Sequence, residues 1–363
     1  MTPGPFRLSV QQAAWLVFYL TISVTPFSFS EEMIKTMGRW AWAGVLPGLA
    51  LGVVALGAVA VLRHRLPRSS VLDYAPQLLG RFAGWLYIML LGLLCALGAG
   101  VNLHVFVDML HSTLTSYLSG WVPALVMTAL ATYLAFFGPE VIARVATALL
   151  VAVVPELFLL ATMPWLNSVP GRLWPLWTVP WGRLFARAST ASVLGTCQGF
   201  IVLLLLAPVV EGRRFVRSTL LAVLAGSAMI MVGFAIPVAV FGPHLAAQFR
   251  FSLLDASGTV SWAWLPLQRL GHLTVLFWEM LVFVVAATDL WMAAALGAWV
   301  LLSGRWRPLV LVLGGVTLLF TGPAFGPTMQ EALFTVWDWG VVLLAIVLPV
   351  ALALAALPRR RDA

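Results

Sequence analysis

Two long apolar stretches of the chain each contain a short polar interruption whose residues can hold a small solute. The interruptions are Ser23, Thr25 and Pro26 in the first stretch, and Gly195, Thr196, Gln198 and Gly199 in the second. Proline removes a backbone donor and disfavours helix at the preceding residue, and glycine weakens a helix. The freed backbone groups and the nearby hydroxyl and amide side chains can bind a polar ligand. A proline kink and a small-residue packing face are the alternative interpretation.

Ionisable residues inside apolar stretches form a second set of candidates. They are Glu156, Glu279, Asp289 and Asp338, together with His104 and Asp108, which are four residues apart. Such groups are costly in an apolar environment and often serve a proton or ion path, or hold a ligand ammonium. Neutral carboxyls, or side chains reaching water near an interface, are the alternative. We expect Glu156, Glu279 and Asp289 to be possible ion or gating residues, and Asp108 and Asp338 to lie near helix ends.

The composition places these residues in a membrane protein. Of the 363 residues, 62% are hydrophobic and 9% are charged, whereas soluble domains are about 45–50% apolar and about 25% charged. The net charge of +8 comes from Arg-rich breaks between apolar runs, so we attribute it to helix ends facing anionic lipid and not to nucleic-acid binding. Both cysteines, Cys95 and Cys197, lie in apolar runs and are expected to be unpaired. We expect no metal site, cofactor or enzymatic activity, because the chain lacks the spacing of known catalytic motifs.

Ten stretches are long and apolar enough to span a bilayer, which needs about 20 residues. The expected spans are 11–30, 41–62, 83–107, 121–137, 141–166, 190–210, 218–241, 273–301, 308–324 and 336–357. The Trp- and Pro-rich segment 167–189 is expected to be an interfacial loop, and 242–272 to contain a short surface helix. The prediction is an all-α integral membrane protein.

The basic residues indicate an orientation. With the N terminus in the cytoplasm, 14 of the 21 Lys and Arg residues fall on the cytoplasmic side and 7 on the other. Because cytoplasmic loops are enriched in Lys and Arg, both termini are expected to be cytoplasmic.

Ten spans divide into two halves of five within a single domain, 1–363. An odd number of spans per half makes the second half enter the membrane inverted, so we expect inverted repeats over about 9–170 and 185–357. The two polar interruptions then fall at equivalent places, in spans 1 and 6. This arrangement predicts a ligand site near the midplane, between two broken helices.

Several short motifs resemble, in order and spacing, those of one known family. They are 38–42, 66–74, 79–85, 138–144, 276–279, 348–349 and 359–361. The segment around Asp73 and Tyr74, followed by Gly80, is similar to a loop of spore germination permeases, and 138–144 is similar to their connection between spans 4 and 5. The resemblance covers essentially the whole chain.

This resemblance implies a ten-span fold of the amino acid/polyamine/organocation transporter superfamily, LeuT-like, with helices 1 and 6 broken. It also implies the permease-like subunit of a nutrient germinant receptor in the spore inner membrane. Such a subunit would sense a small-molecule nutrient and work with a larger membrane subunit and a lipoprotein subunit. An autonomous amino-acid or amine secondary transporter is the alternative function, and a membrane enzyme is a third.

Two positions depart from the superfamily pattern. Amino-acid transporters usually carry glycines at the break in span 1, where this chain has Ser23, Thr25 and Pro26. Span 6 has the neutral Gln198, where an acidic residue could serve a cationic group. These departures argue against backbone capture of a carboxylate, so the ligand need not be a simple α-amino acid.

Overall fold

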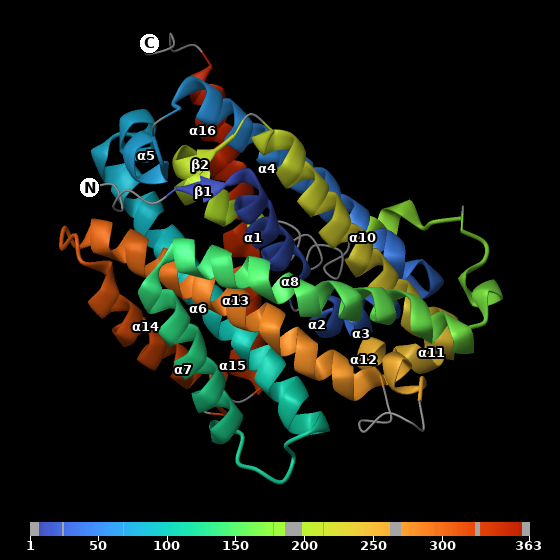
Figure 1. The fold of residues 1–363 in the computed structure, drawn as a ribbon. Coiled ribbons are helices and arrows are strands. Elements are labelled where there is room, and N and C mark those ends of the chain that lie inside the picture. Colours follow the sequence, from blue (N-terminus) through green and yellow to red (C-terminus); the bar gives the residue numbers. More distant parts are fainter. Residues whose placement is uncertain are drawn as a thin grey trace.

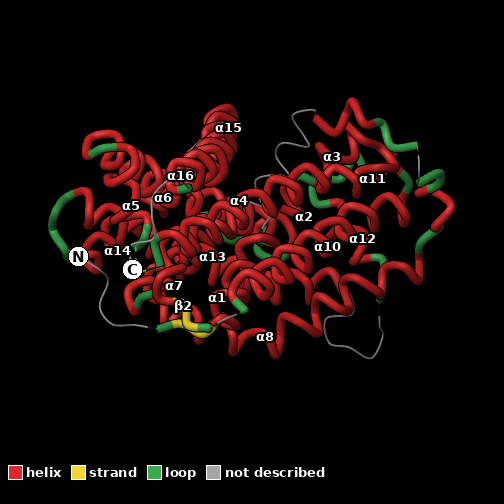
Figure 2. The backbone as a smooth tube through the Cα atoms, turned by 90° about the horizontal axis from the view of Figure 1, so that it is seen from above, coloured by secondary structure: helices red, strands yellow, loops and turns green. Residues whose placement is uncertain are grey.

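The computed structural model describes residues 7–23, 25–67, 69–176, 178–185, 198–212, 214–261, 270–323 and 327–357. Within them almost all regular structure is helical (Figure 2). The exception is a parallel pair of two-residue strands, β1 (Leu8–Ser9) and β2 (Val210–Glu211), with Leu8 opposite Val210. The all-α prediction is thus correct apart from this small pair.

The first half of the chain contains the first five spans and their connections. Its helices are α1 (Val10–Ile22), α2 (Thr25–Ser28), α3 (Ser30–Met37), α4 (Leu46–Arg65), α5 (Val71–Leu79), α6 (Arg81–Thr113), α7 (Trp121–Phe137) and α8 (Pro139–Thr162). A 3₁₀ segment, Gly38–Val45, precedes α4. A 3₁₀ turn at Met163–Asn167 extends span 5, and short 3₁₀ turns at Pro170–Leu173 and Trp181–Phe185 lie in the predicted interfacial loop.

The second half repeats the alternation of long helices and short connections. The helix of span 6 is described over Gln198–Val209, and β2 follows it. The later helices are α10 (Phe215–Phe241), α11 (Pro243–Ala246), α12 (Ser252–Gly258), α13 (Leu270–Val300), α14 (Trp306–Thr321), α15 (Pro327–Val341) and α16 (Leu348–Ala356). A π-helical segment, Val342–Val347, joins α15 to α16 into one span. Two short helices lie in 242–272, where one surface helix was expected: α11 is partly exposed, whereas α12 is mostly buried.

The described helices can be assigned to ten membrane crossings. Six described helices are long and apolar enough to cross a membrane by length and composition, and three shorter apolar helices accompany them. The broken first span, α1 with α2, makes the tenth. Some ends differ from the hydropathy windows: α6 continues to Thr113, and the last span begins at Pro327 instead of 336. Backbone hydrogen bonding continues past the apolar window into polar sequence, so helices exceed the hydrophobic stretch that reveals them.

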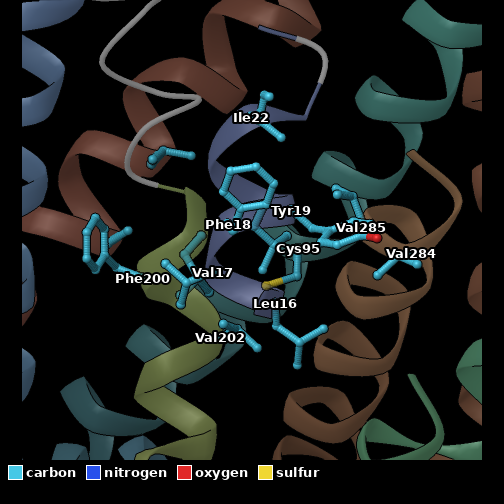
Figure 3. Close-up of a cluster of buried hydrophobic side chains, with 14 of the residues drawn as sticks. Leu16, Val17, Phe18, Tyr19, Ile22, Cys95, Phe200, Val202, Val284 and Val285 are labelled. Carbon is cyan, nitrogen blue, oxygen red and sulfur yellow. The ribbon is translucent and has the colours of Figure 1, made fainter. Parts of the chain in front are cut away.

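The helix α1 lies inside the protein and not on its surface. Figure 3 shows its side chains, including Leu16, Phe18 and Tyr19, among those of Cys95, Phe200 and Val285. At the centre of the fold α6 and α13 run side by side (Figure 1) and form the most extensive helix contact of the described residues.

Span 6 packs against α1 without an intervening side chain. A Cβ atom at Gly199 would lie 2.9 Å from the carbonyl oxygen of Val17 and 3.0 Å from the hydroxyl of Thr21. Such close backbone contact is typical of small residues at membrane helix interfaces.

Polar contacts gather at the two ends of the molecule. At one end Arg7 pairs with Glu211 at 2.8 Å, and Arg63 donates to the carbonyl of Val210 at 2.7 Å. At the opposite end, near α11 and α12 in Figure 1, Arg250 pairs with Asp108 at 2.6 Å and Asn167 donates to the carbonyl of Thr259 at 3.0 Å.

Each of these contacts joins parts of the chain that are separated by an even number of predicted crossings. An even number of crossings returns the chain to the same side, so the contacts agree with the ten-span path. We refer to the end with α11 and α12 as the outer end, following the predicted orientation.

The first prediction tests this path at Ser119 and Ser303, two exposed loop residues separated by five crossings. In cells expressing the full chain with Cys197→Ser, an impermeant maleimide should label Ser119→Cys from outside. It should label Ser303→Cys only after permeabilisation. Cys95 is buried and should give little background. Labelling of both from one side would contradict the ten-span path, and the reversed pattern would contradict the orientation alone.

The second prediction concerns the contact of span 6 with α1. Gly199→Ala should lower the thermal unfolding midpoint of the purified protein, because its methyl group would press on the Val17 backbone and overpacking costs about 1–3 kcal/mol. Gly57→Ala is the matched control, since a Cβ there meets no atom within 4 Å. An unchanged midpoint for Gly199→Ala would show that the two helices are not in close contact.

Candidate functional site

The break in span 1 directs a hydroxyl into the centre of the protein. The helix α1 ends at Ile22, and Ser23 caps it with its N–H bonded to the carbonyl of Tyr19 and with non-helical backbone angles, φ 14° and ψ −130°. The next helical turn, α2, begins at Thr25. The Ser23 side chain donates to Oδ1 of Asn102 in α6 at 2.5 Å. The predicted interruption of span 1 is therefore present.

Four side chains from four spans form a central polar cluster, consisting of Ser23, Asn102, Gln198 and Asp289. Oδ2 of Asp289, in α13, accepts from Nε2 of Gln198 at 2.7 Å and from Nδ2 of Asn102 at 3.2 Å. All four residues are at most 1% exposed. The cluster thus links spans 1, 3, 6 and 8 inside the protein.

The orientation of Asn102 follows from its neighbours. Its Nδ2 also donates to the carbonyl of Gly98 at 2.8 Å, and a carbonyl can only accept. Oδ1 must therefore face Ser23. Sequence reasoning missed Asn102, although an amide within the apolar run 83–107 was an available signal.

The cluster also borders the last span through Gly98 and Trp337. A Cβ atom at Gly98 would lie 2.9 Å from Nε1 of Trp337, in α15, and 3.3 Å from Oδ2 of Asp289. Gly98 therefore keeps a side chain out of the space between the indole and the carboxyl group. Trp337 itself is 2% exposed.

One acceptor of the cluster has no partner in the described part of the chain. Oε1 of Gln198 is buried and has no hydrogen-bond partner among the described residues. Leaving a buried acceptor unpaired costs about 1–3 kcal/mol. A ligand that donates to this oxygen would remove that cost.

The structure separates the other residues predicted for the ligand site. Thr25 is buried, and Pro26 lies against α10, where a Cβ at Gly233 would be 3.1 Å from its ring. Gly199 contacts α1, as described above. Gly195 and Thr196 lie outside the described residues.

Of the three possible ion or gating residues, Asp289 alone belongs to the cluster. Glu156, in α8, is 3% exposed and lies beside Thr274 of α13; its Oε1 has no hydrogen-bond partner among the described residues. Thr274 precedes Asp289 by 15 residues on one helix, which is roughly 20 Å at about 1.5 Å per residue. Glu279 is half-buried on the same helix, about 15 Å from Asp289 by the same rise.

A cavity of about 390 Å³ lies on the outer side of the cluster. Its polar lining consists mainly of Glu31, Glu32, His104, Asp108, Arg250, Gln330, Glu331 and Asp338. None of the four cluster residues lines this cavity, but it lies close to the cluster in the chain, since Asp338 follows Trp337 on α15 and His104 is two residues from Asn102 on α6. Asp108 and Asp338 line this cavity inside long helices and not at helix ends, because both helices are longer than predicted.

No group of three possible metal ligands from His, Cys, Asp and Glu is found in the described part of the chain.

Three solved structures share this fold. The sialic acid symporter, a Na⁺-coupled protein in a substrate-bound outward-open state, has a TM-score of 0.67 at 12% identity, covering 95% of this chain and 80% of the other. MhsT in complex with L-phenylalanine has a TM-score of 0.66 at 14% identity, covering 96% and 89%. The Eremococcus coleocola manganese transporter has a TM-score of 0.59 at 13% identity, covering 94% and 78%. At these identities the likeness concerns the fold, which is that of the LeuT-type transporters, and not the ligand.

Sequence comparison assigns the family. No curated protein sequence matches the chain significantly. The family model described as spore germination protein, the spore permease family, matches residues 7–325, which is most of the chain. The expected resemblance is confirmed, and the chain belongs to the spore germination permease family, built on a LeuT-type membrane fold.

Proposed function

We propose that the protein is the permease-like subunit of a spore germinant receptor, and that it binds a small polar nutrient at the central polar cluster. Binding would trigger germination together with a larger membrane subunit and a lipoprotein subunit in the spore inner membrane. Both termini would be cytoplasmic. The observation that supports the site best is the buried Oε1 of Gln198, near the break in span 1, which has no hydrogen-bond partner among the residues that the structure describes.

The cluster offers groups suited to a polar ligand. Gln198 provides an acceptor that has no partner among the described residues. The Ser23 hydroxyl, which now bonds to Asn102, can bond to a ligand instead, and the interrupted backbone of span 1 offers N–H and C=O groups. In this proposal Thr25, Pro26, Gly195, Thr196 and Gly199 shape the two broken helices around the ligand. Glu156 and Glu279 are proposed to act in gating or ion passage, away from the ligand.

The outer cavity supports access from outside. Its lining includes the cluster-adjacent segments of α6 and α15, and Arg250 and Asp108 pair across its edge. At the inner end Arg7, Glu211 and the two paired strands hold the N-terminal segment against span 6. A nutrient would therefore reach the cluster from the outer side.

The third prediction tests the site by germination. Gln198→Ala and Ser23→Ala should each raise the half-maximal nutrient concentration roughly tenfold to hundredfold, because one lost hydrogen bond to a buried polar ligand costs about 1–3 kcal/mol. Thr162→Ala is the hydroxyl control for Ser23→Ala, since Thr162 is only partly buried and its hydroxyl bonds only to its own helix in the described contacts. An unchanged dose–response in both variants, at normal protein levels, would exclude this site.

The fourth prediction distinguishes a receptor subunit from an autonomous transporter. The transporter is the second candidate function because the fold is similar to three transporter structures. Liposomes containing the full chain alone should accumulate no more of the active nutrient than empty liposomes do. Spores lacking the gene should fail to respond to that nutrient. Concentrative uptake by the chain alone, blocked by Gln198→Ala, would favour the transporter.

A further inference from the structure

Glu279 is a carboxylic residue inside a membrane span whose side chain has no partner among the described residues. It is half-buried on α13, and none of the four described ion pairs includes it. It does not line the outer cavity either. An ionisable group against lipid is costly, and such groups usually face a polar or charged partner. A counter-charge from outside the chain would meet this requirement.

The depth of Glu279 in the membrane follows from the neighbouring helix α8. Glu156 of α8 lies beside Thr274 of α13, and the ten-span path runs these two helices in opposite directions. Glu279 is five residues further along α13, which is about 7.5 Å at about 1.5 Å per residue. It therefore lies near the depth of Val151, close to the centre of the expected span 141–166 and away from both membrane surfaces.

The face of α13 around Glu279 is open only in the outer half of the helix. Every residue from Val284 to Ala294 is buried, whereas a series of apolar residues before them is partly exposed, Leu276 to 40%. The members of this series are Leu273, Leu276, Met280 and Phe283. We call these four residues together with Glu279 the outer stripe.

We propose that the outer stripe packs against a transmembrane helix of the larger membrane subunit, and that an Arg or Lys of that helix pairs with Glu279. The inference rests on the receptor function proposed above. The four apolar residues are separated by three, four and three positions, which is the spacing of the a and d positions of a helix–helix seam. Glu279 then occupies the flanking g position, where ion pairs form between packed helices.

The charge of the stripe favours a different protein over a second copy of this chain. The expected spans contain one Lys or Arg residue, Arg144, which lies near the inner end of span 5. A second copy therefore has no such cation at the depth of Glu279. In a two-fold interface through this stripe, each copy would also bring its own Glu279 toward the other, and like charges repel.

The helix α13 connects the outer stripe to the central polar cluster. Trp278, next to Glu279, is buried, and its ring packs edge-on against Phe27 of α2 with 4.5 Å between the ring centroids. The same helix carries Asp289 of the cluster. A change in the broken span 1 on ligand binding would thus act on the helix that contacts the partner. In this way the gating role proposed for Glu279 is exerted through the larger subunit.

Photo-crosslinking tests the stripe without changing Glu279. The full chain is co-expressed with the other two receptor subunits, and p-benzoylphenylalanine replaces Leu276 or Phe283. Val312 and Leu319, which are 62% and 54% exposed on α14, are the matched control positions on another surface helix. Adducts with the larger membrane subunit are expected from both stripe positions and from neither control position.

Variants of Glu279 then test the ion pair. Glu279→Gln and Glu279→Arg should each lower the amount of larger subunit that co-purifies with the chain at least about tenfold, because a charge in the interface is left unpaired. Changing one membrane-embedded Arg or Lys of the larger subunit to Glu should restore co-purification with Glu279→Arg. Glu140→Gln, which removes a carboxylate paired with Arg144 at the inner end, should leave it unchanged.

Three results would overturn the inference. They are no adduct with the larger subunit from either stripe position, adducts with a second copy of this chain instead, and co-purification that neither Glu279 variant lowers. If Gln198→Ala still shifts the nutrient dose–response in such a case, the proposed receptor function stands without this interface. If the wild-type chain neither crosslinks to the other subunits from any position nor co-purifies with them, the receptor function fails as well.

Discussion

A helix broken within a membrane must find partners for its freed polar groups, and the centre of this protein is organised around that requirement. Span 1 stops at Ile22, and the Ser23 hydroxyl bonds to Asn102 of α6. From Asn102 the hydrogen bonds continue to Asp289 and then to Gln198. In an apolar interior each of these groups would be costly alone. The break in one span therefore requires polar residues in three others.

This chain of hydrogen bonds has a mechanical consequence. These hydrogen bonds join spans 1 and 6 to α6 and α13, which pack against each other along their lengths at the centre of the fold. A ligand that binds Asp289 or Gln198 competes with the bonds that hold these two groups of helices together. Differential binding of this kind is what allows a ligand to shift a conformational equilibrium. The same contacts can thus serve recognition in either a receptor subunit or a transporter.

The two ends of the molecule differ in how they close over the cluster. At the inner end the strand pair, the Arg7–Glu211 ion pair and the Arg63 bond to Val210 tie the N-terminal segment, span 2 and span 6 together. At the outer end a cavity of about 390 Å³ extends between α6, α15 and the loop that carries Arg250. The Arg250–Asp108 pair is partly exposed, and such pairs contribute only about 0–1 kcal/mol. Because the Arg7–Glu211 pair of the inner end is even more exposed, the outer end is distinguished by its cavity and not by the strength of its ion pair.

Local sequence determined the elements of this protein. Span positions, the break at Ser23 to Pro26 and the presence of a short helix in 242–272 follow from hydropathy, proline and polar composition, because these act within about 20 residues. The helix ends beyond the apolar windows, as at Thr113 and Pro327, depend on backbone hydrogen bonds that hydropathy does not register.

Only the tertiary structure decided which of the candidate site residues are in contact with one another. Gln198 bonds to Asp289, 91 residues away, and Ser23 bonds to Asn102, 79 residues away. Gly199, equally plausible from its sequence, instead lets span 6 approach α1. Side-chain partners depend on how each helix is rotated and packed against the others. That rotation is set by the summed contacts of the whole core, which no local pattern in one sequence records.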